Sequence, residues 1–370
     1  MKKQRLKRSS LILLADVICS LSLRPLCAQI HEAVNDRSPV LNLAVSTEGQ
    51  VAIKRKGWVS YAPVVFGTNL LLGDLLKVGE SSSVKVVCSD LKIRDITAGM
   101  AGIPCPASPA FLRAPDGSRI NVTRSNGASL MVLAPRKTKV LSTHPLLRWT
   151  PVEGATTYTV IVRAENFYWS RQVNAITELQ YPEDAPRLQP GVVYKAIVRT
   201  ADKSSESEAG LGLGFSILDP GEKKIVEDEQ REVESLGLPD GPTQFILAHL
   251  YAAHGLESEA IQRLELVSGS FKVAAVDRSL GDFYLQVGLV RDAEKYYLNS
   301  LDISTPESDA EGQMRSHLAL AHIYRHALGN RKMASQHFDA ALALARQIGD
   351  DLVIAEAAQQ SAELKTVAGP

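Results

Sequence analysis

Few residues of this chain stand in a pattern typical of catalysis or metal binding. The nearest approach is His322-Ile323-Tyr324-Arg325-His326, in which two histidines four residues apart would share one face of a helix. An isoleucine stands where a zinc metalloprotease needs its glutamate, and no third ligand is evident, so surface histidines are the simpler interpretation. The sequence contains no glycine-rich phosphate loop, no Gly-x-Ser-x-Gly elbow and no His-Glu-x-x-His motif. We therefore predict a protein that is not an enzyme and that uses no metal or cofactor.

Cysteine usage gives a second chemical expectation. Cys19 and Cys27 fall within the first 28 residues, and Cys88 and Cys105 lie further along the chain. An even pair in a chain bound for an oxidising compartment predicts one disulfide between Cys88 and Cys105. Two reduced, buried thiols are the alternative, because free cysteine is among the residues most often buried. With no histidine nearby, the two thiols would make a poor zinc site.

The first 28 residues have the composition of a secretory signal peptide. Basic residues precede an apolar run over 11–23, and Leu26-Cys27-Ala28 offers a cleavage site. An uncleaved anchor is the alternative, although the run is short for a membrane span and Asp16 interrupts it. We predict that residues 1–28 are a signal peptide, that the mature chain has no integral membrane span, and that the protein is periplasmic or secreted.

Removal of the signal changes the charge balance. The whole chain has 41 basic and 41 acidic residues, of which six basic residues and one acidic residue lie in the signal. The mature chain then has 41 − 6 = 35 basic and 41 − 1 = 40 acidic residues, a net charge near −5. This charge gives no overall attraction to nucleic acid or to an anionic membrane. We expect no nucleic-acid partner.

The elements that must carry any function are clearest over residues 243–348, where the chain repeats itself. A large apolar residue, a small residue and a tyrosine recur as Leu247-Ala248-x-x-Tyr251, Leu280-Gly281-x-x-Tyr284 and Leu320-Ala321-x-x-Tyr324. Nine residues after the first two tyrosines come Ala260 and Ala293. This spacing predicts pairs of helices that approach closely at the small residues.

Glycines stand where each helix pair must turn, at Gly255, Gly288 and Gly329. Such a turn needs a residue that tolerates positive φ. The first two tyrosines lie 284 − 251 = 33 residues apart. That interval is close to the period of about 34 residues of the tetratricopeptide repeat, which the pattern resembles. The third interval is 324 − 284 = 40 residues, and the packing positions that follow it fall one residue late, at Ala334, Phe338 and Ala341.

The resemblance implies a tetratricopeptide-repeat array over 242–370, with a capping helix over 351–366. In that family the first helix of each pair lines a concave groove that binds an extended peptide or a partner helix. The alternative is that the repeats only support the fold or self-association. Carried over by position, the groove face consists of eight residues: Phe245, His249, Arg278, Asp282, Gln286, Leu318, His322 and Arg325.

Residues 40–110 are expected to form a small β domain. Val51 and Ile53 alternate with other residues, and 83–87 reads as a further strand. The stretch Leu70-x-x-Gly73-Asp74-x-Leu76 resembles the core of the FecR-type domain, a periplasmic β module of iron-citrate signal transducers. That resemblance implies a binding or spacing module. Asp74 is interpreted as a turn residue.

A β-sandwich is expected over residues 138–219. Strand patterns over 146–149, 158–162 and 192–198 are separated by proline and glycine. The stretch Leu188-x-Pro190-Gly191-x-x-Tyr194 resembles the tyrosine corner of fibronectin type III domains, in which the phenol bonds to the backbone. We expect core or edge-strand packing for aromatic side chains of this domain, namely Trp149 and at least two of Phe167, Tyr168 and Trp169.

Two segments connect these units. Residues 111–137 belong to a stretch rich in proline, serine and glycine and are assigned to a connector. Residues 222–241 contain a heavily charged run, which predicts a solvated linker helix that ends near Pro239.

The predicted fold class is therefore multidomain β plus α, with a FecR-like β domain, a fibronectin type III-like sandwich and a helical repeat array. We expect a non-enzymatic exported scaffold or adaptor that binds a protein or peptide through the groove in the cell envelope. Two alternatives remain open: an envelope sensor of FecR type, and a cell-wall or carbohydrate-binding protein.

If Cys88 and Cys105 are joined, the mature chain should contain no thiol that reacts with an alkylating reagent under denaturing, non-reducing conditions. Intact mass should show no added reagent before reduction and two added groups after it. A chain that takes up reagent without reduction would contradict the disulfide.

Overall fold

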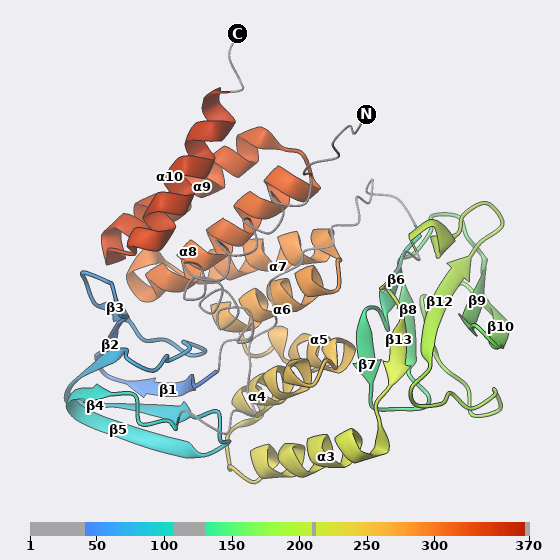
Figure 1. The fold of residues 1–370 in the computed structure, drawn as a ribbon, viewed down its shortest axis with the longest axis horizontal. Coiled ribbons are helices and arrows are strands. Elements are labelled where there is room, and N and C mark those ends of the chain that lie inside the picture. The colour runs from blue at the N-terminus through green and yellow to red at the C-terminus, as the bar shows by residue number, and fades with distance from the viewer. Residues whose placement is uncertain (1–40, 107–129, 209–211, 367–370) are drawn as a thin grey trace, which may run out of the picture.

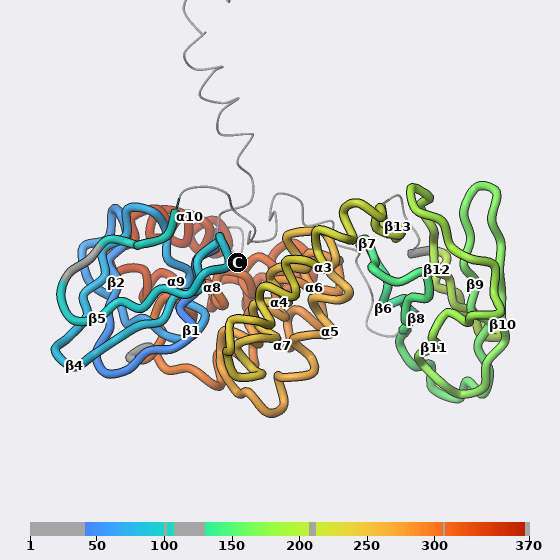
Figure 2. Tube along the Cα trace, turned by 90° about the horizontal axis from the view of Figure 1, so that it is seen from below, coloured from blue at the N-terminus to red at the C-terminus, as the bar shows by residue number. Residues whose placement is uncertain are grey.

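The computed structural model describes residues 41–106, 130–208 and 212–366. The predicted signal peptide over 1–28 and most of the predicted connector over 111–137 lie outside the described residues. The N-terminal β domain and a second β domain lie at opposite ends of the molecule, with helices between them (Figure 1, Figure 2). In Figure 1 the last helices also lie above the N-terminal sheet.

The N-terminal β domain is one antiparallel sheet built around a long strand, β4 (Leu75–Val87). One edge of β4 pairs with both β1 (Leu43–Glu48) and β2 (Val51–Lys54), and the other edge pairs with β5 (Ile93–Gly102). The short β3 (Ala62–Pro63) extends the sheet beyond β2. The strand predicted over 83–87 is thus the second half of β4.

A disulfide joins the segment after β4 to the segment after β5. Cys88 and Cys105 are bonded, with their Cα atoms 5.4 Å apart, and both side chains are buried. The bond ties the chain that leaves β5 back to the end of β4. In the chain-entropy account, a loop of this size stabilises the fold by about 3 kcal/mol.

The second β domain is a sandwich of two sheets with orders β10-β9-β12-β13-β7 and β11-β8-β6. Its core contains Trp149, of which 1% is exposed, and Trp169, whereas Tyr168 points outward with 66% exposed. The strands are β6 (Val132–Ala134), β7 (Thr138–Val140), β8 (Leu146–Trp149), β9 (Thr157–Ala164), β10 (Phe167–Asn174), β11 (Glu178–Gln180), β12 (Val193–Arg199) and β13 (Phe215–Ile217).

The sandwich begins earlier than its predicted boundary at 138. Strand β6 lies within the segment assigned to the connector, but it pairs with β8 and so completes the smaller sheet. The apolar residues over 130–133 are consistent with a strand, but so short a strand does not indicate from sequence to which domain it belongs.

The C-terminal helices form three antiparallel pairs, as the repeated pattern predicts. The turns between paired helices contain Gly255, Gly288 and Gly329, with φ of 74°, 81° and 66°. A β-carbon at Gly281 would lie 2.8 Å from the ring of Tyr297, which shows how closely paired helices approach. The helices are α4 (Asp240–Ala253), α5 (Glu257–Ser268), α6 (Ala274–Gln286), α7 (Val290–Ile303), α8 (Pro306–His322) and α9 (Arg331–Ile348).

A π-helical turn explains why the third repeat runs one residue late. Helix α8 continues into η2 (Ile323–Ala327), and this wider turn inserts one residue between Tyr324 and Gly329 compared with the earlier repeats. The inserted residue is absorbed without loss of packing, since Ala334 and Phe338 are both fully buried.

One additional helix covers each end of the array. Helix α10 (Asp351–Thr366) follows α9 over the range predicted for a capping helix. Helix α3 (Pro220–Glu234) packs against α4 through Val226 and Val233, neither of which is exposed. The prediction of a solvated linker helix is therefore wrong for the face of α3 that contains Val226 and Val233. These two valines, seven residues apart, cover the end of the array.

The replacement Ala293→Leu should overpack the α6–α7 contact. Ala293 is fully buried, so three extra carbon atoms should lower the free energy of unfolding by about 1–3 kcal/mol. Arg291→Leu, at an exposed position of the same helix, should change it by less than about 0.5 kcal/mol. Denaturant unfolding of both variants is the measurement, and equal midpoints would contradict the close helix pairing.

Candidate protein-binding groove

The first helices of the three pairs, α4, α6 and α8, carry most of the predicted groove face, and the chain's own β domain packs against this side of the array. The two units share two clusters of buried hydrophobic side chains. Side chains of β2, β3 and β4 pack with array residues Ala310, Met314, Leu344, Ala345 and Ile348. We call this contact between residues 41–106 and the array the docking interface.

At one end of the docking interface an aromatic side chain enters the array. The ring of Phe66 lies 4.9 Å from that of Phe245 on α4 and 4.9 Å from that of Phe271, which precedes α6. The adjacent Gly67 has φ of 79°, and a β-carbon there would lie 2.4 Å from the β-carbon of Ala275. Only glycine combines this backbone conformation with so close an approach to the helix.

In the middle of the docking interface one arginine joins two carboxylates. Arg55 donates to both oxygens of Glu311 on α8, with Nη2–Oε distances of 2.7 Å, and to Oδ2 of Asp74 at 2.7 Å. The side chains of Arg55, Asp74 and Glu311 are 11%, 3% and 15% exposed. Burial raises the pKa of Asp74, although Leu71 N and Arg55 both stabilise its charged form. The arginine fixes the position of the β domain along α8.

At the far end the β domain contacts the turn between α9 and α10. Trp58 Nε1 donates to Asp350 Oδ2 at 3.0 Å, and Ser60 N donates to Ile348 O at 3.2 Å. A β-carbon on Gly349 would lie 2.7 Å from that of Val59. The docking interface therefore extends from the first repeat to the end of the third.

Three predicted groove residues lie in the buried interior of this side. Phe245 contacts Phe66, and His249 lies beside it with ring centroids 4.7 Å apart. His249 Nε2 is 3.2 Å from Ser279 Oγ, while its Nδ1 is buried without a hydrogen-bond partner. Burial, with the charge of Arg315, lowers the pKa of His249 to about 4, so the imidazole is neutral at pH 7. Arg278, 9% exposed, forms an ion pair with Asp309 at 3.1 Å.

Two other predicted residues bond within the array. Asp282 accepts a hydrogen bond from Tyr297 OH at 2.6 Å, and burial raises the pKa of this carboxyl group. Gln286 donates to Glu257 Oε1 at 3.0 Å. Asp282 and the amide nitrogen of Gln286 thus bond within the array, whereas Gln286 Oε1 is buried without a hydrogen-bond partner.

The remaining three predicted residues face the array's own core and its last helix. Leu318 packs against the core, His322 Nε2 is 3.0 Å from Glu356 Oε1, and Arg325 donates to Glu363 on α10 at 3.0 Å. The rings of His322 and His326 stack. Within the described ranges, no group of three His, Cys, Asp or Glu side chains could hold a metal ion.

The sandwich contacts the array at a separate place, where the helix pairs turn. Lys139 N donates to Gly255 O at 2.7 Å, Arg136 Nε donates to Val287 O at 2.9 Å, and Arg148 pairs with Glu265 at 2.7 Å. Glu259 Oε1 accepts from Leu141 N, and burial raises the pKa of Glu259 to about 7. The array is thus held on two sides by the two β domains.

The side chains that the β domain contributes to the docking interface are not marked by any pattern in the sequence. Arg55, Trp58 and Phe66 all lie between glycines in irregular segments, where no periodicity marks a buried side chain. The one available signal was a large aromatic residue directly before Gly67.

Comparisons with known proteins agree with the helical part of this description. Residues 272–351, which span α6 to α9, match the tetratricopeptide repeat family. No curated protein sequence matches the chain.

Three solved structures are similar over parts of the chain. Two are crystal structures of MamA, with 14% and 15% identity, TM-scores of 0.28 and 0.30, and coverage of 40% of this chain and 96% and 80% of theirs. The third is BtubC from P. vanneervenii, with 16% identity, a TM-score of 0.26, and coverage of 39% of this chain and 72% of the other. At scores this low, no partner or activity is carried over from these proteins.

The replacement Phe66→Ala should loosen the docking interface. Loss of a half-buried ring that contacts two other aromatic rings should lower the free energy of unfolding by about 2–4 kcal/mol. Amide hydrogens of α4 and α6 should then exchange faster, because the β domain protects them less. Tyr168→Ala, at an exposed ring of the sandwich, is the control and should leave that exchange unchanged. Equal exchange in both variants would show that Phe66 does not hold the domain.

Proposed function

We propose that this protein is an exported, non-enzymatic scaffold of the cell envelope whose repeat groove binds protein and already holds its own β domain as an intramolecular ligand. The observation that carries the proposal is the docking interface. In it Phe66 contacts α4 and Arg55 contacts α8, as side chains of a bound partner would. The match of residues 272–351 to the tetratricopeptide repeat family supports a role in protein–protein interaction.

A partner that uses the groove must compete with the β domain. A tethered domain has an effective concentration of about the millimolar range, so a free partner needs either high affinity or prior weakening of the docking interface. The contacts at the two ends are separate, since Phe66 meets the first repeat and Trp58 meets the last turn. A partner could therefore displace the domain from one end at a time.

Features of the two β domains support the finer assignments made from sequence. In the sandwich, Tyr194 OH accepts a hydrogen bond from Gln189 N at 2.8 Å, which is the bond expected of a fibronectin-type tyrosine corner. In the N-terminal domain, Asp74 accepts from Leu71 N and so closes the turn before β4. We assign the two domains to fibronectin type III-like and FecR-like modules on these grounds.

Export rests on the signal-like sequence of residues 1–28 and on the Cys88–Cys105 bond. Outside hyperthermophiles, structural disulfides form and persist mainly in oxidising compartments. Among the helices of the described residues, none has the length and hydropathy that a membrane span requires.

An envelope sensor is the second candidate, and one observation favours it. Arg55 joins Asp74 of the β domain to Glu311 of the array, so a change at the β domain would alter a contact made by α8. In this function the β domain would receive the signal and the freed groove would transmit it.

The scaffold proposal can be tested with three forms of the full-length protein. The double variant Arg55→Ala, Phe66→Ala should open the groove, and the matched control Tyr168→Ala, Arg171→Ala removes an exposed aromatic residue and a partly buried arginine from the sandwich. In affinity capture from envelope fractions of the source organism, we expect at least one protein to be retained about tenfold more by the open variant than by the other two.

A further substitution separates groove binding from general exposure of apolar surface. Ala275 is 3% exposed beneath Gly67, so Ala275→Arg in the open variant should block the groove and abolish the added capture. Identical capture by closed and open forms, or capture that survives Ala275→Arg, would refute the proposal.

A further inference from the structure

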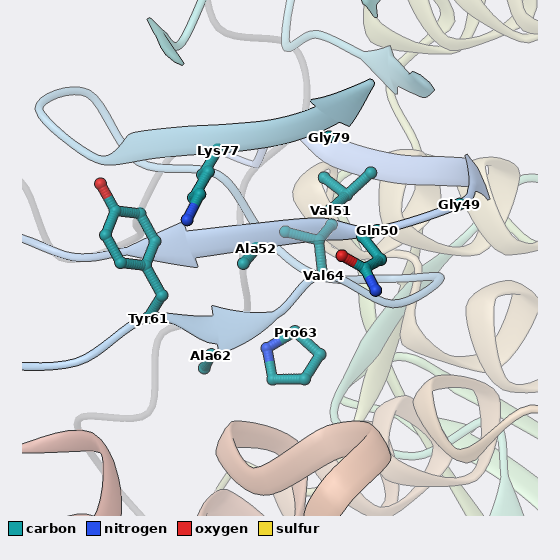
Figure 3. A pocket seen from close by; sticks show the side chains of 10 residues that line it. All are labelled: Gly49, Gln50, Val51, Ala52, Tyr61, Ala62, Pro63, Val64, Lys77 and Gly79. Carbon is teal, nitrogen blue, oxygen red and sulfur yellow. The ribbon is translucent and has the colours of Figure 1, made fainter. Parts of the chain in front are cut away.

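The outer face of the β domain contains a pocket of about 490 Å³. Three residues of its lining, Val51, Ala62 and Val64, also pack in the docking interface, but from the opposite face of the sheet. Its lining residues come from β2, β3, β4 and the segments beside them (Figure 3). Ala52 pairs in register with Pro63 on one side and with Lys77 on the other. Because a methyl group stands between two larger side chains, the centre of this face is hollow.

The two ends of the pocket differ in chemistry. Figure 3 shows Tyr61 and Lys77 together at one end and Gln50 with Gly49 at the other. Lys77 is exposed, and no hydrogen bond or ion pair joins its ammonium group to any residue in the described part of the chain. The pocket thus combines an aromatic ring and an available cation at one end with a side-chain amide at the other.

Charges near the pocket restrict what the amide end can accept. Glu48 precedes Gly49 and Glu80 follows Gly79, and both carboxylates are exposed. A second anionic group of a ligand at this end would be repelled, whereas hydroxyl groups would find hydrogen-bond partners. The arrangement favours a ligand with one carboxylate and an otherwise neutral, polar body.

We propose that this pocket binds a saccharide that carries a single carboxylate, of about disaccharide size. The ring of Tyr61 offers a flat face for the apolar side of a sugar ring, Lys77 pairs with the carboxylate, and Gln50 bonds hydroxyl groups of the second ring. The volume suits such a ligand, since sites for small molecules are typically about 300–1,000 Å³. This site stands whether or not the groove binds a partner.

The test uses cellobiouronate, a disaccharide with one carboxylate, as the probe and the full-length protein as the receptor. Saturation-transfer NMR and calorimetric titration should show binding of cellobiouronate, and at least tenfold weaker binding of the neutral cellobiose. Lys77→Gln should reduce the affinity for cellobiouronate about tenfold, because one charge-assisted contact is worth roughly that factor. Lys85→Gln, at another exposed lysine of β4, is the matched control and should leave the affinity unchanged.

A second substitution and a second ligand complete the test. Tyr61→Ala should weaken binding of the probe severalfold, since the stacking surface is lost, and circular dichroism would show that the sheet is intact. Absence of cellobiouronate binding at millimolar concentration, equal binding of cellobiose, or equal loss in the Lys85 variant would overturn the proposal. So would tighter binding of a dipeptide carboxylate, which would identify the site as one for peptide C-termini.

Discussion

The burial of Arg55 between Asp74 and Glu311 is the constraint on which the arrangement of the molecule depends. A guanidinium removed from water is costly unless carboxylates satisfy its donors, and here both carboxylates lie within 2.7 Å of it. The pair brings together a turn of the β domain and the first helix of the third repeat. Such a contact contributes little net stability, but it permits only one alignment of the β domain along the array. Phe66 and Trp58 then fill the ends of that alignment.

The third repeat departs from the repeated pattern where this contact is made. Helix α8 has 17 residues, compared with 14 in α4 and 13 in α6. Its first turn is interrupted at Asp309, which bonds Gly312 N and pairs with Arg278 of α6. The residues that follow, Ala310, Glu311 and Met314, are those that meet the β domain. At the start of α8, the residues that depart from the repeated pattern are thus the ones that contact the β domain. At its end, the π-helical turn inserts one residue and α9 still packs normally.

The packing of the β domain against the first helices limits what those helices can contact. A free array would offer its first helices to any extended peptide, but here α4, α6 and α8 already contact a folded domain of the same chain. The sandwich occupies a different side, at the helix turns, through backbone carbonyls that a helix end leaves available.

The sequence by itself determined the local structure of most units. Repeated small residues and glycines identified three helix pairs, and alternating apolar residues identified β9, β12 and the second half of β4 but not β5 or β10. The Leu188–Tyr194 motif indicated the hydrogen bond from Gln189 N to Tyr194 OH. Each of these signals depends on neighbours a few residues apart. The sequence also indicated the cysteine pair, because Cys88 and Cys105 are the two cysteines that follow residue 28. Only the tertiary structure decided that the β domain packs against α4, α6 and α8. The contact joins Arg55 to Glu311 across 256 positions of sequence, and the residues around each of them do not indicate which residue it will pair with. For the same reason the eight groove residues could be assigned to helix faces from their spacing, whereas what covers each face depended on the packing of distant segments.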